Sequence, residues 1–208
     1  MDDRARRSTG VTDAELPANT TEASSGSIDA SAARDMMVAY QSGVLEGFKD
    51  LYALLAPPLR RYLGYLARHH DVADDLLQET FLQMHRSRAS WDPTRPVAPW
   101  AFGLARNVFL MHRRAASRFS AVHQASDSPP EIPVPAEADS LAARDLVQRA
   151  LAALGIDQSE SLLLHHVWGF TFEEIAGMTG VTPAAARARS SRAMAALRAT
   201  LSAGQERP

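Results

Sequence analysis

The stretch FTFEEIAGMTGVTPAAARARSSRAMAALRATL, residues 170–201, decides the fold of the C-terminal part of the chain. Thr171 and Glu174 have the spacing of a capping box, which predicts the start of one helix. Gly180 stands where that helix should end, because glycine readily adopts a positive φ. Thr182 is a good N-cap for a second helix. Two helices joined by a short turn that contains glycine are typical of a helix-turn-helix.

The second of these helices is basic. It carries four arginines with no acidic residue between them: Arg187, Arg189, Arg192 and Arg198. Arginine on such a helix can bind phosphates or read guanine in the major groove. The alternative is an amphipathic helix pair with a solvated arginine face, and the density of arginine favours DNA binding. The motif alone does not distinguish a repressor from an activator.

Acidic and basic segments alternate along the chain, and the net charge of −2 hides this asymmetry. Residues 1–33 carry −3, residues 34–119 carry +4, residues 120–140 carry −4 and residues 141–208 carry +1. We expect the first segment, which is rich in Ser, Thr, Ala, Asp and Glu, to be disordered. The third contains four prolines and is predicted to be an extended linker. Two basic blocks separated by acidic segments indicate that the blocks contact nucleic acid.

The remaining sequence has helical periodicity and no convincing strand pattern, so the predicted fold class is all-α. We expect two small helical domains, residues 34–119 and 141–204. The helix that carries Leu51 is predicted to end near Pro57 and Pro58. Further helices are expected after Asp71, from Pro99, over 141–154 and 158–167, and as two short segments after them.

Two of these helices have a clear apolar stripe. In the helix after Asp71, Leu77, Phe81 and Met84 should point inward, whereas Asp75, Gln78 and Glu79 should lie on the opposite face. The acidic face is either solvated or a docking surface for a basic partner. In the helix from Pro99, the predicted stripe consists of Trp100, Leu104, Val108 and Met111.

Residues 85–118 combine arginine with aromatic residues. They contain Arg86, Arg88, Arg95, Arg106, Arg113, Arg114 and Arg118 against one acid, Asp92. Such a mixture suits single-stranded nucleic acid, in which bases stack and phosphates pair with cations. Core packing is an equal alternative for Trp100. Trp91, in the proline-rich loop 90–99, is harder to place in a core.

Several classes of function are excluded or disfavoured. The chain has no cysteine, which rules out disulfides, thiol catalysis and the usual zinc sites. It has no apolar run long enough to cross a membrane and no secretory signal, so we expect a cytoplasmic protein without membrane insertion. No nucleophile–base pair, phosphate-binding glycine loop or metal-ligand spacing is present. The neighbours His69-His70 and His165-His166 should point apart on their helices. We therefore expect no enzyme activity, no cofactor and no metal.

Three motifs in order resemble a known family. They are DDLLQETFLQMHR (74–86), RPVAPWAFGLARN (95–107) and the terminal helix-turn-helix. Together they are similar to sigma-70-type RNA polymerase sigma factors, and most of all to the extracytoplasmic-function (ECF) group, which keeps the second and fourth conserved regions. The resemblance covers about residues 36–118 and 141–201.

The resemblance implies the partners and the site residues. Asp75, Gln78 and Glu79 would bind the coiled coil of the β′ clamp of core RNA polymerase. The fourth region would pack on the β flap, and the acidic linker would run through the polymerase toward the RNA exit path. An anti-sigma factor is expected to cover the polymerase-binding faces.

The resemblance also implies promoter DNA as a ligand of both domains. The helix from Pro99 would melt the minus-ten element. Residues for that element are Arg86, Arg88, Trp91, Trp100, Arg106, Asn107, Arg113 and Arg114. Residues for the minus-thirty-five duplex are Thr182, Ala185, Arg187, Arg189 and Arg192. The loop 86–96 would hold a flipped base.

The chain departs from the family pattern at several positions. Ala184, Ala185 and Ala186 replace the usual Gly-Thr-Val, so a hydroxyl that could touch DNA is missing. Ser190 stands where Leu or Ile is usual. Trp168 replaces a polar residue, and we expect it to face a partner.

Two other functions remain open from the residues. One is a stand-alone helix-turn-helix transcriptional regulator, which the acidic segments disfavour because they compete with phosphates for arginine. The other is an adaptor that binds protein only, with the arginine helix solvated.

Overall fold

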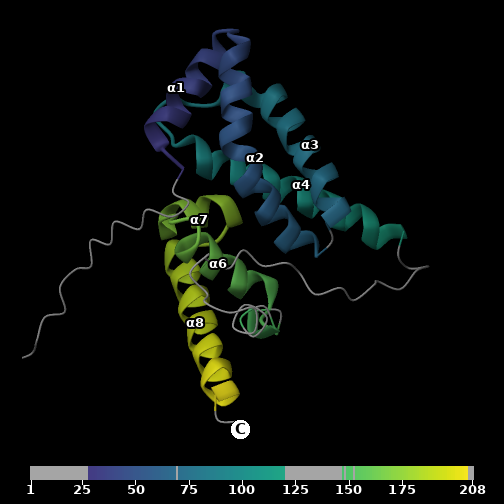
Figure 1. The fold of residues 1–208 in the computed structure, drawn as a ribbon, viewed down its shortest axis with the longest axis vertical. Coiled ribbons are helices and arrows are strands. Elements are labelled where there is room, and N and C mark those ends of the chain that lie inside the picture. The colour runs from purple at the N-terminus through teal and green to yellow at the C-terminus, as the bar shows by residue number, and fades with distance from the viewer. Residues whose placement is uncertain (1–27, 69, 120–146, 148, 152, 206–208) are drawn as a thin grey trace, which may run out of the picture.

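The computed structural model describes residues 28–68, 70–119, 147, 149–151 and 153–205, and the regular elements in those ranges are helical (Figure 1). In chain order they are α1 (Ala30–Gln41), α2 (Leu45–Ala67), α3 (His70–Ser87), the short 3-10 helix η1 (Arg88–Ser90), α4 (Val97–Phe119), α6 (Ile156–His166), α7 (Phe172–Thr179) and α8 (Pro183–Gln205). This confirms the predicted all-α class.

Helices α1 to α4 form the first unit, in which α2 packs against each of the other three. Leu51, Leu55, Leu59 and Leu63 recur every four residues along α2 and are completely buried. That spacing places them on one stripe of the helix. Burial of each contributes roughly 1.5–3 kcal/mol, so this stripe is the centre of the core.

The prediction that this helix ends at its prolines was wrong, because α2 continues through Pro57 and Pro58. A proline inside a helix removes a backbone hydrogen bond and costs about 3 kcal/mol. The leucine stripe lies on both sides of the pair in one core, and its burial outweighs that loss. Pro58 is itself buried and adds apolar contact.

Helix α1 begins inside the segment that we predicted to be disordered. The carboxylate of Asp29 accepts hydrogen bonds from the backbone N–H groups of Ser31 (2.9 Å) and Ala32 (3.1 Å) and so caps the helix. Ala33 is completely buried. The first unit therefore starts before residue 34. Residues 1–27 lie outside the described residues, as do the predicted linker 120–140 and most of the helix predicted over 141–154.

The inward face of α3 is as predicted, since Leu77, Phe81 and Met84 are buried. The start of α4 is also close to the prediction. The helix begins at Val97, and Pro99 lies in its first turn, where a missing N–H group is tolerated.

The stripe predicted for α4 was wrong at its end, because Met111 is 60% exposed. Val108 is buried as predicted, and Trp100 and Leu104 are partly buried against the core. The helix also buries Ala101, Phe102, Ala105 and Phe109, which the predicted stripe did not include.

The second unit contains the predicted helix-turn-helix. Thr171 Oγ1 accepts from the N–H of Glu174 (3.2 Å), and Glu174 Oε2 accepts from the N–H of Thr171 (2.8 Å). Gly180 ends α7 with φ of 73°. Thr182 Oγ1 accepts from the N–H of Ala185 (3.2 Å) at the start of α8. Each local signal in this stretch is confirmed, although α8, with 23 residues, is longer than the short helix we predicted.

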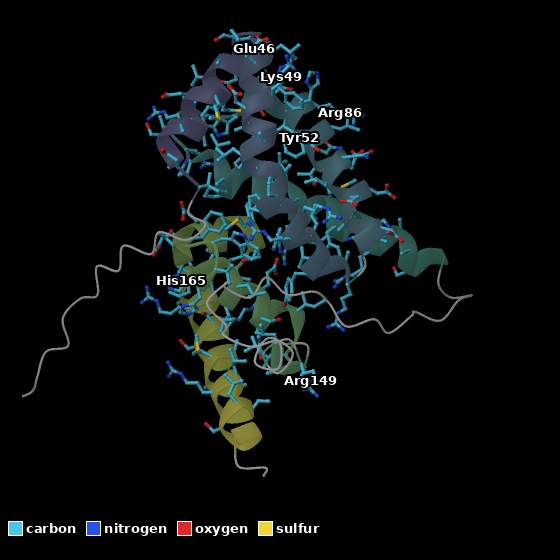
Figure 2. All side chains as sticks on the ribbon, in the orientation of Figure 1. Glu46, Lys49, Tyr52, Arg86, Arg149 and His165 are labelled. Carbon is cyan, nitrogen blue, oxygen red and sulfur yellow. The ribbon has the colours of Figure 1, made fainter. Side chains whose placement is uncertain are left out.

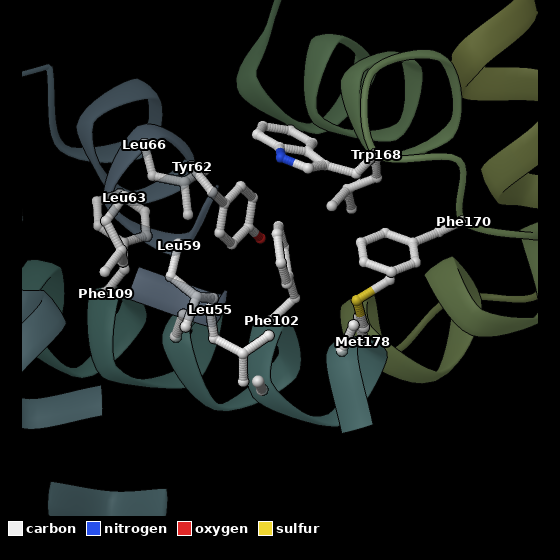
Figure 3. Packing of buried hydrophobic residues seen from close by; sticks show 14 of the residues in the cluster. Leu55, Leu59, Tyr62, Leu63, Leu66, Phe102, Phe109, Trp168, Phe170 and Met178 are labelled. Atoms are coloured by element: carbon white, nitrogen blue, oxygen red, sulfur yellow. The ribbon is translucent and has the colours of Figure 1, made fainter. Parts of the chain in front are cut away.

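The two units contact each other through aromatic side chains (Figure 3). The ring of Trp168 lies 5.5 Å from those of both Tyr62 and Phe102, each in an edge-on arrangement. Phe170 lies 4.9 Å from Phe102. Trp168 is therefore buried, and the surface it faces belongs to the first unit of the same chain. Figure 1 shows α7 at this junction, with α8 extending away from it.

We predict that Thr171→Ala lowers the free energy of unfolding by about 1 kcal/mol, because α7 loses its N-cap. The measurement is the midpoint of urea denaturation followed by circular dichroism. Thr200→Ala is the matched control, since Thr200 is exposed within α8 and bonds only the preceding turn there, at Ala196 O. Equal midpoints for the two variants would contradict the role of the cap.

Candidate polymerase and nucleic-acid interfaces

The acidic face of α3 is directed away from the core. Asp75 and Gln78 are exposed, and Glu79 is half-buried. Glu79 accepts a hydrogen bond from Gln83 (2.7 Å) and pairs with Arg86 at 3.4 Å. Asp75 and Gln78 are thus available to a partner, whereas Glu79 is held in place by its neighbours along the helix.

An apolar groove of about 590 Å³ lies beside this face, between α1, α2 and α3. Leu45 and Leu82 on its walls are 60% and 50% exposed, and Tyr52 is also exposed. Gln78 lines the groove as well, so the groove and the acidic face are continuous. Figure 2 labels Tyr52 on this side of the molecule. Exposed apolar side chains gathered next to polar ones indicate a protein-binding surface.

This groove was not predicted from the sequence. Its one signal was Leu82, an apolar residue of α3 that falls outside the stripe of Leu77, Phe81 and Met84. The rest of the groove comes from three different helices, which periodicity cannot bring together.

The segment that follows α3 is braced by polar contacts. Gln41 Nε2 donates to the carbonyl oxygens of Arg88 (2.6 Å) and Trp91 (2.9 Å). Arg88 donates to the carbonyl of His85 (2.7 Å), and its guanidinium lies over the ring of Tyr40. Arg88 is half-buried and Arg86 is exposed. This segment is therefore pre-formed rather than loosely attached.

Trp91 contradicts the expectation that it would be hard to place in a core. It is only 3% exposed, and its ring lies 6.5 Å from that of Trp100. Its Nε1 is buried without a hydrogen-bond partner among the described residues. Just beyond it, Asp92 accepts a hydrogen bond from the N–H of Thr94 (2.9 Å), which lowers the pKa of Asp92. The aromatic side of the loop is turned inward, so Trp91 does not offer a free face for stacking.

One face of α4 carries the other residues predicted for the minus-ten element. Trp100, Asn107 and Arg114 follow one another at intervals of seven residues, which places them on one side of the helix. Trp100 is half-buried, and Asn107 and Arg114 are exposed. Arg113 is exposed too, and its guanidinium lies over the ring of Phe109. This side of α4 can offer an amide and cations to a nucleic-acid strand.

Arg106 is the exception on α4. Its Nε lies 3.0 Å from Oε1 of Glu160 on α6, in the second unit. The hydroxyl of Tyr62 donates to the same oxygen at 2.6 Å. Burial raises the pKa of Tyr62 well above its usual value, and the neighbouring carboxylate of Glu160 raises it further. Arg106 is therefore bound within the chain rather than presented to DNA.

The arginines of α8 differ in their exposure. Arg187 and Arg192 are exposed, whereas Arg189 and Ala185 are half-buried. The guanidinium of Arg187 lies 5.2 Å from the ring centre of Phe172. The hydroxyl of Thr182 is occupied by the helix cap. Of the arginines predicted to bind minus-thirty-five duplex, Arg187 and Arg192 are therefore the exposed ones and are available to DNA.

The expectation that His165 and His166 point apart was wrong, since their ring centres are 4.8 Å apart. His165 Nδ1 lies 2.8 Å from the carbonyl oxygen of Phe170, and its ring stacks on Phe172 at 4.3 Å. Burial lowers the pKa of His166, and His165 and Arg198 lower it further. The two rings help to line a hollow of about 350 Å³ beside α8. The described residues contain no group of three side chains able to hold a metal ion.

Comparisons with known proteins agree with this division into two units. The family described as Sigma-70 region 2 matches residues 51–119, and Sigma-70, region 4 matches residues 144–197. The chain is 33% identical over 168 residues to the RNA polymerase sigma factor CarQ of Myxococcus xanthus, covering 79% of this chain and 95% of CarQ. It is 32% identical over 156 residues to the ECF RNA polymerase sigma factor SigL of Mycobacterium tuberculosis, covering 74% and 88%.

A solved structure is similar as well. It is the complex of the sigma factor RpoE with the anti-sigma factor NepR from Bartonella quintana, with a TM-score of 0.63 and 30% identity. The match covers 74% of this chain and 96% of that one. Among the described residues, no helix is both long enough and apolar enough to cross a membrane.

We predict that alkaline pH weakens the contact between the units. Burial raises the pKa of Tyr65 to about 12 from an ordinary 10.0, and its hydroxyl bonds Ser159 of the second unit. A raised pKa means that the folded state prefers the neutral phenol. Its stabilisation is thus present below pH 10 and is lost as the pH rises toward 12. The measurement is phenolate absorbance against pH, with Tyr65→Phe expected to remove one late step. A wild-type titration without that late step would contradict the assignment.

Proposed function

The chain belongs to the ECF group of sigma-70 RNA polymerase sigma factors, and we propose that it directs initiation through three separate surfaces. The acidic face and groove of α2 and α3 bind core polymerase, the exposed side of α4 binds the melted minus-ten strand, and α8 binds minus-thirty-five duplex. The proposal rests on one observation. The apolar groove and acidic face of α2 and α3 are separate from the two cationic surfaces on α4 and α8. A promoter-melting factor needs all three, and it acts in the cytoplasm, where polymerase and promoters meet.

The polymerase surface combines two kinds of contact. Asp75 and Gln78 offer a carboxylate and an amide to a basic partner, such as the coiled coil of the β′ clamp. Leu45, Tyr52 and Leu82 offer apolar area in the adjoining groove. Apolar area supplies most of the affinity in such interfaces, and the charges orient the partner. The second unit would contact the β flap.

The nucleic-acid surfaces suit different ligands. One side of α4 carries Asn107, whose amide can hydrogen-bond to a base edge, and Arg114, whose guanidinium can bind a phosphate. Such a surface suits a single strand, whose backbone is followed by cations. Helix α8 follows a capped turn and presents Arg187 and Arg192, as a recognition helix in a major groove does.

An anti-sigma factor is the third partner that we propose. The similar structure of RpoE was solved in complex with the anti-sigma factor NepR. The exposed groove on α2 and α3 supports such a partner here, because a protein that covers it would prevent binding to polymerase.

We predict that Asp75→Ala/Glu79→Ala lowers affinity for core polymerase at least about tenfold, because two carboxylates leave the docking face. The measurement is binding of fluorescently labelled protein to purified core polymerase. Asp35→Ala/Asp50→Ala is the matched control, since both aspartates are exposed in the first unit. Similar affinities for the two double variants would reject this docking face. Absence of binding by wild type, together with specific duplex binding by the chain alone, would instead favour the stand-alone regulator.

We predict that Asn107→Ala leaves polymerase binding unchanged and reduces promoter opening about tenfold or more, because an amide contact with a base edge worth about 1–3 kcal/mol is lost. Opening is measured by permanganate reactivity of unpaired thymines in the minus-ten element. A variant that opens promoters at the wild-type rate would show that Asn107 is only a solvated side chain.

A further inference from the structure

Gln41, the last residue of α1, holds the segment that leads from α3 to α4. Its Nε2 donates to the carbonyl oxygens of Arg88 (2.6 Å) and Trp91 (2.9 Å). A side-chain amide nitrogen carries two N–H groups, so one is available for each carbonyl. Arg88 is the first residue of η1, and Trp91 directly follows it. One side chain from a distant part of the sequence therefore spans η1 from end to end.

The residue before Gln41 holds the same segment through side chains. The hydroxyl of Tyr40 lies 2.5 Å from Nδ1 of His85, and the guanidinium of Arg88 lies 5.7 Å from the centre of the Tyr40 ring. Tyr40 is buried, whereas Gln41 is half-buried. The end of α1 thus contacts Arg88 in two ways: Gln41 bonds its backbone, and Tyr40 packs against its side chain.

Beyond η1 the chain forms an exposed tip, residues 92–96, between two buried anchors. Trp91 is 3% exposed and Val97, the first residue of α4, is 1% exposed. All five residues between them are exposed. Gln41 fixes the first anchor, because it bonds the carbonyl of Trp91 itself. The position of the exposed tip relative to α4 therefore depends on Gln41.

The exposed tip carries polar groups that can distinguish bases. Asp92, Thr94 and Arg95 offer a carboxylate, a hydroxyl and a guanidinium, which can bond the edges of bases. The N–H groups of Thr94 and Arg95 each bond to Asp92 at 2.9 Å, the first to its carboxylate and the second to its carbonyl. A turn with such internal bonds moves as one body. Its groups are presented in one place only while its anchors are held.

The exposed tip adjoins the side of α4 that we propose for the minus-ten strand. The rings of Trp91 and Trp100 lie 6.5 Å apart. Trp100 begins the row on α4 that continues with Asn107 and Arg114. A strand bound along this row would meet the exposed tip at the N-terminal end of α4.

We infer that Gln41 is a positioning residue for base selection: its amide sets the place of the exposed tip and thereby the minus-ten sequence that the chain prefers. The inference rests on the proposed function, because the exposed tip acts on the strand that α4 binds. Gln41 acts through the carbonyls that it bonds and needs no contact with DNA.

The test replaces the donor in the full chain. Gln41→Glu keeps the size of the side chain and places carboxylate oxygens against the two carbonyls, whereas Gln41→Leu removes the polar group. Each variant initiates transcription with core polymerase from promoters with randomised minus-ten and minus-thirty-five positions, and sequencing of the transcribed templates gives the base preferences. At one or more minus-ten positions we expect a preference of about tenfold in wild type to fall to about twofold in both variants. The preferences at the minus-thirty-five element should not change.

A purely structural role for Gln41 gives a different result. Reduced stability lowers initiation from every template by the same factor and leaves both sets of preferences as in wild type. Ser42→Ala is the matched control, because Ser42 is the next residue, is exposed and bonds only the carbonyl of Val38 (3.0 Å) through its hydroxyl. It should keep the wild-type preferences. Wild-type minus-ten preferences in both Gln41 variants, or an equal loss of preference at the minus-thirty-five element, would overturn the inference.

Hydrogen exchange in the free chain tests the anchor without a promoter. The backbone N–H groups of Trp91, Thr94 and Arg95 are bonded within the segment, so their exchange reports its local opening. Gln41→Glu should accelerate their exchange at least about tenfold, whereas amides in the core of α2 should exchange as in wild type. Unchanged exchange would overturn the inference. Failure of wild type to initiate with core polymerase would reject the proposed function and with it the role in base selection, and the exchange rates would still show whether Gln41 holds the exposed tip.

Discussion

The burial of one carboxylate constrains how the two halves of this chain meet. Transferring an isolated carboxylate from water into a protein interior costs several kcal/mol unless partners compensate it. Glu160 meets Tyr62 and Arg106 only when α6 lies across α2 and α4. Aromatic packing alone is less directional and would tolerate small rotations between the units. The hydrophobic contact therefore holds the units together, and the buried charge determines their orientation.

This orientation leaves the functional surfaces unequally accessible. Helix α3 packs on α2 and α4, with Asp75 and Gln78 exposed on its outer side, so its docking face is open in the closed chain. Helix α4 instead contacts α7 and commits Arg106 to the second unit. A partner that docks on α3 can thus bind before the units separate, whereas DNA that needs all of α4 cannot. Under the proposed function, this asymmetry would let the chain bind polymerase before promoter DNA.

Local chemistry made part of the structure predictable. The capping box of Thr171, the turn at Gly180 and the cap at Thr182 are each contained within four residues, so the sequence was sufficient to place them. Burial of Trp91 and Trp168 depends instead on contacts with other elements, including ones about 100 residues away for Trp168. The same limit applies to the apolar groove and to the ion pair of Arg106, whose partners come from separate helices. The pattern of a single helix therefore predicts its polar and apolar faces, whereas contacts between helices determine which of those side chains are occupied.

The composition of α8 explains why both units must work together. At its start are Ala184 and Ala185, which have no polar side chain, and Thr182, whose hydroxyl caps the helix. The exposed cations near the turn are therefore Arg187 and Arg192. Two arginines neutralise few phosphates and read few bases, so they give only weak affinity for duplex DNA. When polymerase holds both units on one promoter, the second contact becomes intramolecular and gains a high effective concentration. Under the proposed function, weak binding by each unit is compatible with specific initiation, and it would keep the free chain off promoters in the absence of polymerase.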